Sequence, residues 1–224
     1  MTTNSATSVP RLENGDRLTR SEFERRYAAM PDIKKAELIE GVVYVASPLR
    51  FRNHAQPHGW LILWLGTYAV ATPGVAFGDA PTVLLDLDNE PQPDAVLFIN
   101  ENAGGNCRIT EDDYIEGAPE LIVEIAASTA SYDMNDKLRA YRRNGVQEYI
   151  VWQIYENRLN WFSLRDSEYV LLQPDSNGNI QSQVFSGLWL AVEALLNGDL
   201  VTVLTQLQNG LATPEHQEFV KRLL

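Results

Sequence analysis

Several features that mark large classes of proteins are scarce or missing in this sequence of 224 residues. The single cysteine, Cys107, excludes an intramolecular disulfide and a zinc site built from several cysteines. No apolar run approaches the roughly 20 residues of a transmembrane helix, so we expect no membrane partner. The first residues, 1–8, have neither the basic start nor the apolar core of a secretory signal. We therefore expect a cytoplasmic protein.

Basic residues are also scarce, with 18 Lys and Arg against 30 Asp and Glu and a net charge of −12 at pH 7. Proteins that bind nucleic acid usually carry a basic surface, because contacts with phosphate dominate their affinity. A nucleic-acid partner would therefore need a local basic patch on a molecule whose overall field repels DNA. A metal-dependent nuclease partly escapes this objection, because bound cations offset its carboxylates.

Common catalytic and metal-binding motifs are absent as well. There is no phosphate-binding glycine-rich loop, GxSxG elbow or Cys–His pair, which argues against nucleotide hydrolysis by a P-loop and against acyl transfer. His54 and His58 have the spacing of two zinc ligands on a helix, but no third ligand is evident. The acidic cluster Asp86, Asp88 and Glu90 lacks the glycine and final glutamate of an EF-hand and predicts a solvated turn.

The sequence does contain alternating strand-like and helix-like segments. Apolar runs predict strands near 36–39, 42–46, 75–79, 81–87, 94–99, 120–127, 147–153, 158–164, 168–173 and 180–185, with a loop over 100–118. Helical spacing and a capping box at 19–22 predict helices near 20–29, 54–70 and 132–143, and after 188 with a break at 209–210. This order predicts an α/β (α+β) fold, a mixed central sheet flanked by helices. We expect a flexible segment over 1–17, a domain over 18–196, and a C-terminal helical extension over 197–224 on the domain or on a partner subunit.

Glu124 is the least expected residue of the predicted strands, because its neighbours from Leu121 to Ala126 are otherwise apolar. A buried carboxylate is costly unless a metal, a cation or hydrogen bonds hold it. Asp94 opens another apolar strand, and Lys137 lies near the start of a helix. Two strand carboxylates and a lysine are the materials of a divalent-metal site for phosphodiester cleavage. The alternatives are a turn aspartate, a structural ion pair and an exposed helix lysine.

The order of the segments around these residues resembles the PD-(D/E)XK restriction-endonuclease-like superfamily, and within it an endonuclease-like family abundant in cyanobacteria. The resemblance covers about residues 20–196 and is carried by the segments 37–41, 47–54, 93–96, 121–125, 133–141 and 145–152. It implies a DNA endonuclease that depends on a divalent metal, Mg²⁺ with Mn²⁺ as a substitute. The alternative is a noncatalytic nucleic-acid-binding or regulatory module that retains the nuclease fold.

The resemblance also implies a role for each site residue. Asp94 and Glu124 would be metal ligands, together with the main-chain carbonyl of Ile125. Lys137 would orient or help deprotonate the attacking water and offset charge near the scissile phosphate. Glu37 matches an additional acid that reaches the metal through water, and the alternative for it is an edge-strand carboxylate.

One position departs from the superfamily pattern. The superfamily lysine follows the glutamate by two residues, where this chain has Ala126, so the lysine must come from the next helix as Lys137. For the substrate we predict contacts from His54, Arg139 and Gln147, while a solvated helix face is the alternative for the arginine. A homodimer is expected, because two cuts in duplex DNA suit twofold symmetry.

Overall fold

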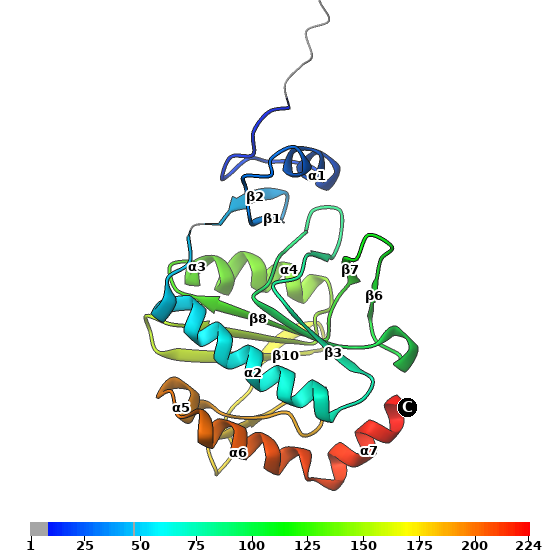
Figure 1. Cartoon of the computed structure of the whole chain (residues 1–224), viewed down its shortest axis with the longest axis vertical. Helices are drawn as coiled ribbons and strands as arrows, with labels where there is room; N and C mark the ends of the chain where they lie inside the picture. The colour runs from blue at the N-terminus through cyan, green and yellow to red at the C-terminus, as the bar shows by residue number, and fades with distance from the viewer. Residues whose placement is uncertain (1–8, 47) are drawn as a thin grey trace, which may run out of the picture.

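A mixed sheet of six strands forms the centre of the computed structural model, which describes residues 9–46 and 48–224. Its order is β11-β10-β9-β8-β5-β3, and within it only β8 and β9 run parallel. The strands are β3 (Val75–Asp79), β5 (Ala95–Ile99), β8 (Leu121–Ala126), β9 (Glu148–Gln153), β10 (Arg158–Arg165) and β11 (Glu168–Leu171). Figure 1 shows α2 (Gln56–Ala71) along one face and α3 (Ala130–Tyr132) with α4 (Leu138–Arg143) along the other. The predicted mixed sheet flanked by helices is confirmed.

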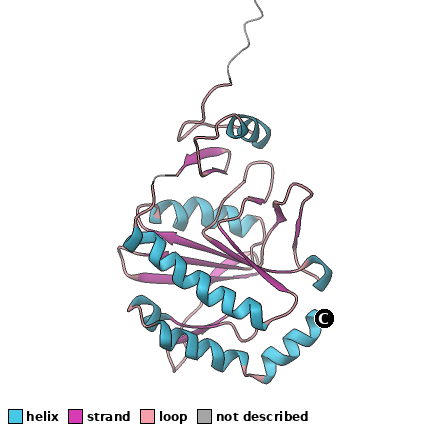
Figure 2. Ribbon diagram, viewed as in Figure 1, coloured by secondary structure: helices cyan, strands magenta, loops and turns pink. Residues whose placement is uncertain are grey.

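Smaller elements surround this sheet. An N-terminal layer, residues 9–46, holds α1 (Arg20–Ala28) and the hairpin of β1 (Ala36–Ile39) and β2 (Val42–Val45). A three-stranded sheet joins β4 (Val83–Leu84), β7 (Ile115–Gly117) and β6 (Cys107–Ile109). A second hairpin, β12 (Asn179–Gln181) with β13 (Trp189–Ala191), precedes α5 (Val192–Leu196), α6 (Leu200–Leu211) and α7 (Pro214–Leu223). Three short helical turns complete the described chain: η1 (Phe51–Ala55), η2 (Glu101–Ala103) and η3 (Asp133–Lys137). Figure 2 shows the N-terminal layer at the top of the view and the C-terminal helices at the bottom, with the sheet between them.

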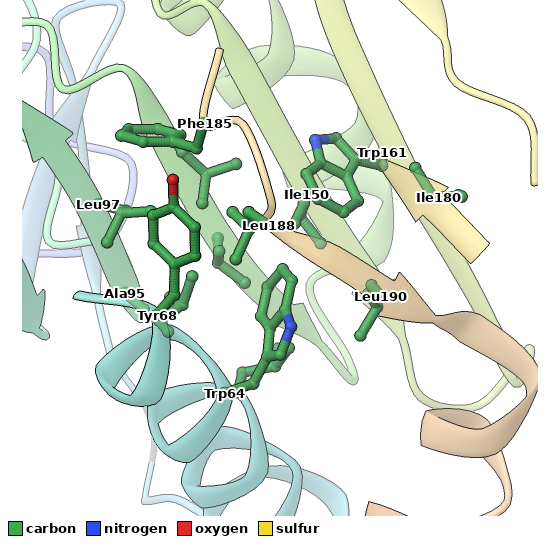
Figure 3. Packing of buried hydrophobic residues seen from close by; sticks show 14 of the residues in the cluster. Trp64, Tyr68, Ala95, Leu97, Ile150, Trp161, Ile180, Phe185, Leu188 and Leu190 are labelled. Carbon is green, nitrogen blue, oxygen red and sulfur yellow. The ribbon is translucent and has the colours of Figure 1, made fainter. Parts of the chain in front are cut away.

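The largest hydrophobic core lies between α2, the sheet and the C-terminal elements. Trp64 and Tyr68 point from α2 into this core (Figure 3), and both are fully buried. Their polar atoms are satisfied, since Trp64 Nε1 donates to the carbonyl of Trp189 and Tyr68 Oη donates to that of Ser186. Leu207 of α6 belongs to the same cluster. The C-terminal extension therefore packs on the core of the domain.

The structure corrects the predictions in the loops and the tail. The segment 100–118, predicted as a loop, contains η2, β6 and β7, and the segment after 188 begins with β13 before it turns helical. Strands this short make weak sequence patterns, because three residues cannot display a period of two. The predicted break at Asn209-Gly210 lies inside α6, where Gly210 packs against the backbone of Gly187. Close packing explains this glycine better than a helix end does.

The start of the described chain also differs from its prediction. Of the segment predicted to be flexible, residues 1–8 lie outside the described residues, whereas Leu12 is buried and Arg17 bridges to Val42. Thr19 is the N-cap of α1 but makes no side-chain cap bond, and Glu22 binds arginines of the same helix instead. The capping box is therefore not formed. Across the described ranges, no helix has both the length and the apolar character needed to cross a membrane.

Candidate functional site

The pairing of β5 with β8 sets Asp94 and Glu124 beside each other. Ala95 lies opposite Val123 in this antiparallel pair, so the next position of the register sets Asp94 opposite Glu124. Opposite residues point to the same face, about 4.5–5.5 Å apart at Cβ. That face is the one covered by α4, since Ile122 packs in the cluster below this helix. Asp94 and Glu124 are 4% and 3% exposed.

Lys137 reaches this pair from η3, a π-helical turn of a kind that often marks functional sites. Its Nζ lies 2.7 Å from Oε1 of Glu124, 2.8 Å from Oε1 of Glu37 and 3.9 Å from Oδ1 of Asp133. The side chain is 2% exposed. The lysine missing at Ala126 is thus replaced in space by one from the following helical segment.

Glu37 belongs to β1 and is held against the sheet by backbone contacts. Its Oε1 accepts a hydrogen bond from the N–H of Gln92, 2.7 Å away, and the next residue, Leu38, bridges to Glu90. The N-terminal layer has a hydrophobic core of its own, around Phe23. A separately packed layer therefore supplies one of the carboxylates of the site.

Asp94 is surrounded by donors and cations. Its Oδ2 accepts a 2.7 Å hydrogen bond from the N–H of Ile125, and its Oδ1 lies 3.1 Å from Nε2 of His54 and 3.7 Å from Nζ of Lys35. Burial alone would raise the pKa of Asp94, but the hydrogen bond of His54, the charge of Lys35 and the Ile125 N–H together hold this pKa well below its ordinary range. His58 supports the backbone here, because its Nε2 contacts the carbonyl oxygen of Asp94 at 2.8 Å.

Glu124 has the opposite electrostatic balance. Burial and the charges of Asp94, Asp133 and Glu37 raise its pKa to about 8, although Lys137 acts to lower it. Burial acts to lower the pKa of Lys137, but the carboxylates around it raise this pKa well above the ordinary value. Carboxylates thus outnumber the ammonium groups in a buried space, which favours the arrival of a further cation.

The groups that could serve as ligands of a hard divalent cation are two carboxylates and a main-chain carbonyl. Lys137 and Tyr141 both donate to Oε1 of Glu124, which leaves Oε2 without a hydrogen bond to a described residue. The N–H of Ile125 points to Asp94, and the carbonyl of the same residue faces the same neighbour, as in any strand. Within residues 9–46 and 48–224, no group of three or more His, Cys, Asp and Glu side chains could hold a metal ion. Two carboxylates suffice for Mg²⁺, which usually keeps several waters and binds substrate phosphate.

The structure does not bring Arg139 and Gln147 to these carboxylates. Arg139 is 62% exposed and pairs with Asp136 on the outer side of the helix. Gln147 precedes β9, and the parallel register sets Glu124 beside Val151, four residues or about 13 Å further along. Helix phase and strand register place both side chains away from the carboxylates, and their contact with substrate stays a prediction. His54, the third predicted contact, does lie at the site.

Three further residues of the site were not predicted as members. Lys35 has no distinctive sequence pattern, because it precedes β1 in a polar stretch. Tyr141 follows Lys137 by four residues and therefore shares its helix face, which is a usable signal. Tyr132 places its ring 5.4 Å from Nζ of Lys137. Ser47, a part of the predicted motif region, lies outside the described residues.

Comparison with known families decides where the chain belongs. The model of the Uma2 family, described as "Putative restriction endonuclease", matches residues 20–193, well over half of the chain. The chain belongs to the Uma2 family. The matched range includes Glu37, Asp94, Glu124 and Lys137, whereas α6 and α7 follow it. The predicted resemblance is thereby confirmed at the level of the family.

The fold of this Uma2 member is also that of a solved structure. A crystal structure described as that of a putative nuclease from Anabaena variabilis matches with a TM-score of 0.59. The match covers 77% of this chain and 96% of that one at 14% sequence identity, which establishes a shared fold. No curated protein matches the sequence.

Proposed function

We propose that the protein is a divalent-metal-dependent endonuclease that hydrolyses phosphodiester bonds in DNA. Membership of the Uma2 family already indicates a nuclease-type function. The observation that carries the finer proposal is the convergence of Lys137 with Glu124, at 2.7 Å, beside an aspartate on the same sheet face. These are the predicted residues, and they meet although they come from three separate elements.

The carboxylates of Asp94 and Glu124, with the carbonyl of Ile125, would hold the metal, for which Mg²⁺ is the natural choice and Mn²⁺ a substitute. Such an ion supplies positive charge for the phosphate and lowers the pKa of a bound water. Asp94 is suited to this role because its low pKa keeps it ionised. The Ile125 N–H fixes one of its oxygens and leaves the other toward the cations.

Lys137 would act by its charge and its position. Since the surrounding carboxylates raise its pKa well above the ordinary value, although burial opposes them, the ammonium group stays protonated. It therefore holds Glu124 and Glu37 in place and offsets negative charge near the phosphate. Proton abstraction by this lysine is not favoured, because its raised pKa keeps the group protonated.

A plasmid assay tests the proposal. Purified protein with Mg²⁺ or Mn²⁺ is expected to convert supercoiled DNA to nicked and linear forms, and Asp94→Asn is expected to abolish cleavage while the thermal unfolding curve keeps its cooperativity. Asp112→Asn, at an exposed loop position, is the matched control and should cut like the wild type. Equal cleavage by the Asp94 variant would identify a contaminating nuclease and sink the assignment.

A noncatalytic nucleic-acid-binding module is the second candidate. The observation in its favour is the closure of the site, since Lys137, Glu124 and Glu37 are 2%, 3% and 7% exposed. A substrate phosphate can reach these groups only if the N-terminal layer moves away from them. DNA binding by a pure sample that never cuts, with any divalent metal, would favour this candidate.

We also propose a homodimer, built on the exposed side of α2 and the edge strand β3. The sequence from Gln56 to Gly78 contains no Asp, Glu, Lys or Arg, on a chain with a net charge of −12. Leu63 and Val70 are 46% and 86% exposed there, and the ring of Phe77 lies over Gly66. Two copies can meet on this uncharged apolar face without like-charge repulsion.

Light scattering after gel filtration measures this directly. The wild type is expected at twice the chain mass, and Leu63→Glu or Val70→Glu at the mass of one chain. Val201→Glu is the control, because Val201 is 79% exposed on α6. A monomeric wild type, or a dimer that all three variants retain, would refute this face.

A further inference from the structure

Two exposed aromatic rings lie beside the site and take no part in the core. Phe51 is 68% exposed and Tyr155 is 60% exposed. Asn53 connects them, because it shares the turn η1 with Phe51 and its Nδ2 donates to Oη of Tyr155 at 3.3 Å. We call Phe51, Tyr155 and the flanking arginines Arg50 and Arg52 the aromatic platform.

The platform adjoins the carboxylates through both of its chain segments. His54, in the same turn η1, lies 3.1 Å from Oδ1 of Asp94. Tyr155 follows the end of β9, whose last residue, Gln153, pairs with Ala126, two residues beyond Glu124. In Figure 1 the start of α2, which follows η1, lies on the same side of the molecule as α3.

The arginines of the platform differ from those of α4. Arg50 and Arg52 are exposed, and neither forms an ion pair with a carboxylate in the part of the chain that the structure describes. By contrast, Arg139, Arg142 and Arg143 each pair with a carboxylate on or near α4. On a chain with a net charge of −12, these two guanidinium groups add positive charge beside the site that no described carboxylate pairs with.

We propose that the aromatic platform binds the unpaired bases of single-stranded DNA beside the candidate site. This inference rests on the proposed nuclease function and names its substrate class. Exposed aromatic rings stack on bases of any sequence, and arginines bind the phosphates between them. A duplex hides the faces of its bases and would gain from the arginines alone.

Binding without cleavage tests the platform separately from catalysis. Fluorescence anisotropy in EDTA compares a labelled oligo(dT) strand with a hairpin duplex of the same total length, and the wild type is expected to bind the single strand more tightly. Phe51→Ala and Tyr155→Ala should each weaken single-strand binding about tenfold, within a range of about 5- to 150-fold, and duplex binding less than about twofold. Tyr114→Ala is the aromatic control, because Tyr114 is 45% exposed between β6 and β7. In Figure 1 these two strands lie on the other side of the molecule from the start of α2.

The arginines have a separate signature. Arg50→Ala with Arg52→Ala should reduce the slope of log affinity against log salt by about 1.4, for two lost single-strand phosphate contacts. Arg222→Ala with Arg165→Ala removes the same charge elsewhere and should leave the slope unchanged.

The outcomes separate this inference from the proposed function. If the platform variants bind the single strand like the wild type, or if the wild type binds no single strand, the platform is refuted, even when a plasmid is cut with Mg²⁺. If platform-dependent single-strand binding is measured but no DNA is cut with Mg²⁺ or Mn²⁺, the nuclease function fails and the binding site stands.

Discussion

Replacing Lys137 by methionine should destabilise the folded protein by about 3–5 kcal/mol at pH 8, the usual cost of removing one partner of a buried ion pair. Methionine keeps the length and the apolar stem of the side chain, so the change isolates the charge. Lys137 is 2% exposed and holds three carboxylates at 2.7, 2.8 and 3.9 Å. Without the ammonium group, these carboxylates repel one another in a space from which water is largely excluded.

The magnitude follows from these distances. Coulomb's law at an effective dielectric constant of about 20 gives about 6 kcal/mol for each of the two short contacts and about 4 kcal/mol for the long one. Two effects offset most of this attraction. The variant does not have to desolvate an ammonium group, and its carboxylates can become protonated. A net cost well above that of a surface pair, about 0–1 kcal/mol, therefore remains.

The cost should also depend on pH with a defined sign. In the wild type the pKa of Glu124 is raised by burial to about 8 and that of Asp133 to about 6, and loss of Lys137 moves both further up. A carboxyl group whose folded pKa exceeds its unfolded pKa loses stability as the pH rises through this window. The variant should therefore approach the wild type near pH 5 and be weakest near pH 8.

Urea unfolding followed by circular dichroism at pH 5 and pH 8 measures both effects. Lys221→Met is the matched control, because Lys221 is 69% exposed in α7 and should change the free energy of unfolding by less than about 0.5 kcal/mol. A cost below about 1 kcal/mol at pH 8, or one that is equal at both pH values, would refute the placement of Lys137 among ionised carboxylates.

Three further predictions concern stability. The free energy of unfolding of Glu148→Gln should rise relative to that of the wild type by about 2–3 kcal/mol as the pH goes from 4.5 to 8. Burial raises the pKa of Glu148 to about 7, so its ionisation in this range opposes folding of the wild type. Equal pH profiles of the two proteins in urea unfolding would contradict this. Tyr141→Phe should cost about 1–2 kcal/mol through its lost hydrogen bond to the site glutamate, measured by thermal unfolding, and no cost would mean that the bond is not formed. Gly105→Ala should strongly destabilise the protein, since a Cβ there would lie 1.8 Å from a main-chain oxygen at the end of β5. Gly59→Ala, on the open face of α2, should stabilise the protein by up to about 1 kcal/mol. A Gly105→Ala variant that is more stable than Gly59→Ala in calorimetry would refute both.

The local pattern of the sequence predicted much of the candidate site. The apolar run around Glu124 predicts a strand buried on both faces, and all six residues of β8 are buried. A carboxylate at that position requires a buried partner, whichever fold surrounds it. The order of segments, by resemblance, added Asp94 and Lys137 to the same hypothesis. These inferences needed no knowledge of which strands are neighbours.

The remaining members of the site depend on contacts between distant segments. The antiparallel register of β5 with β8 sets Asp94 opposite Glu124, and a shift by one residue would have turned the aspartate to the other face. The parallel register of β8 with β9 carries Gln147 away from the site. Neither register can be predicted from a single sequence, because each depends on packing between whole layers.

The sequence by itself therefore determined that an acidic strand position needs a buried polar or charged partner, since the cost of an unpaired charge follows from the residue and its neighbours alone. Only the tertiary structure decided which groups meet that need. Lys137 arrives from η3, Glu37 from a layer with its own core, and His54 from the turn before α2. Long-range packing fixes such distances, and it does so through apolar contacts that are far from the charges they bring together.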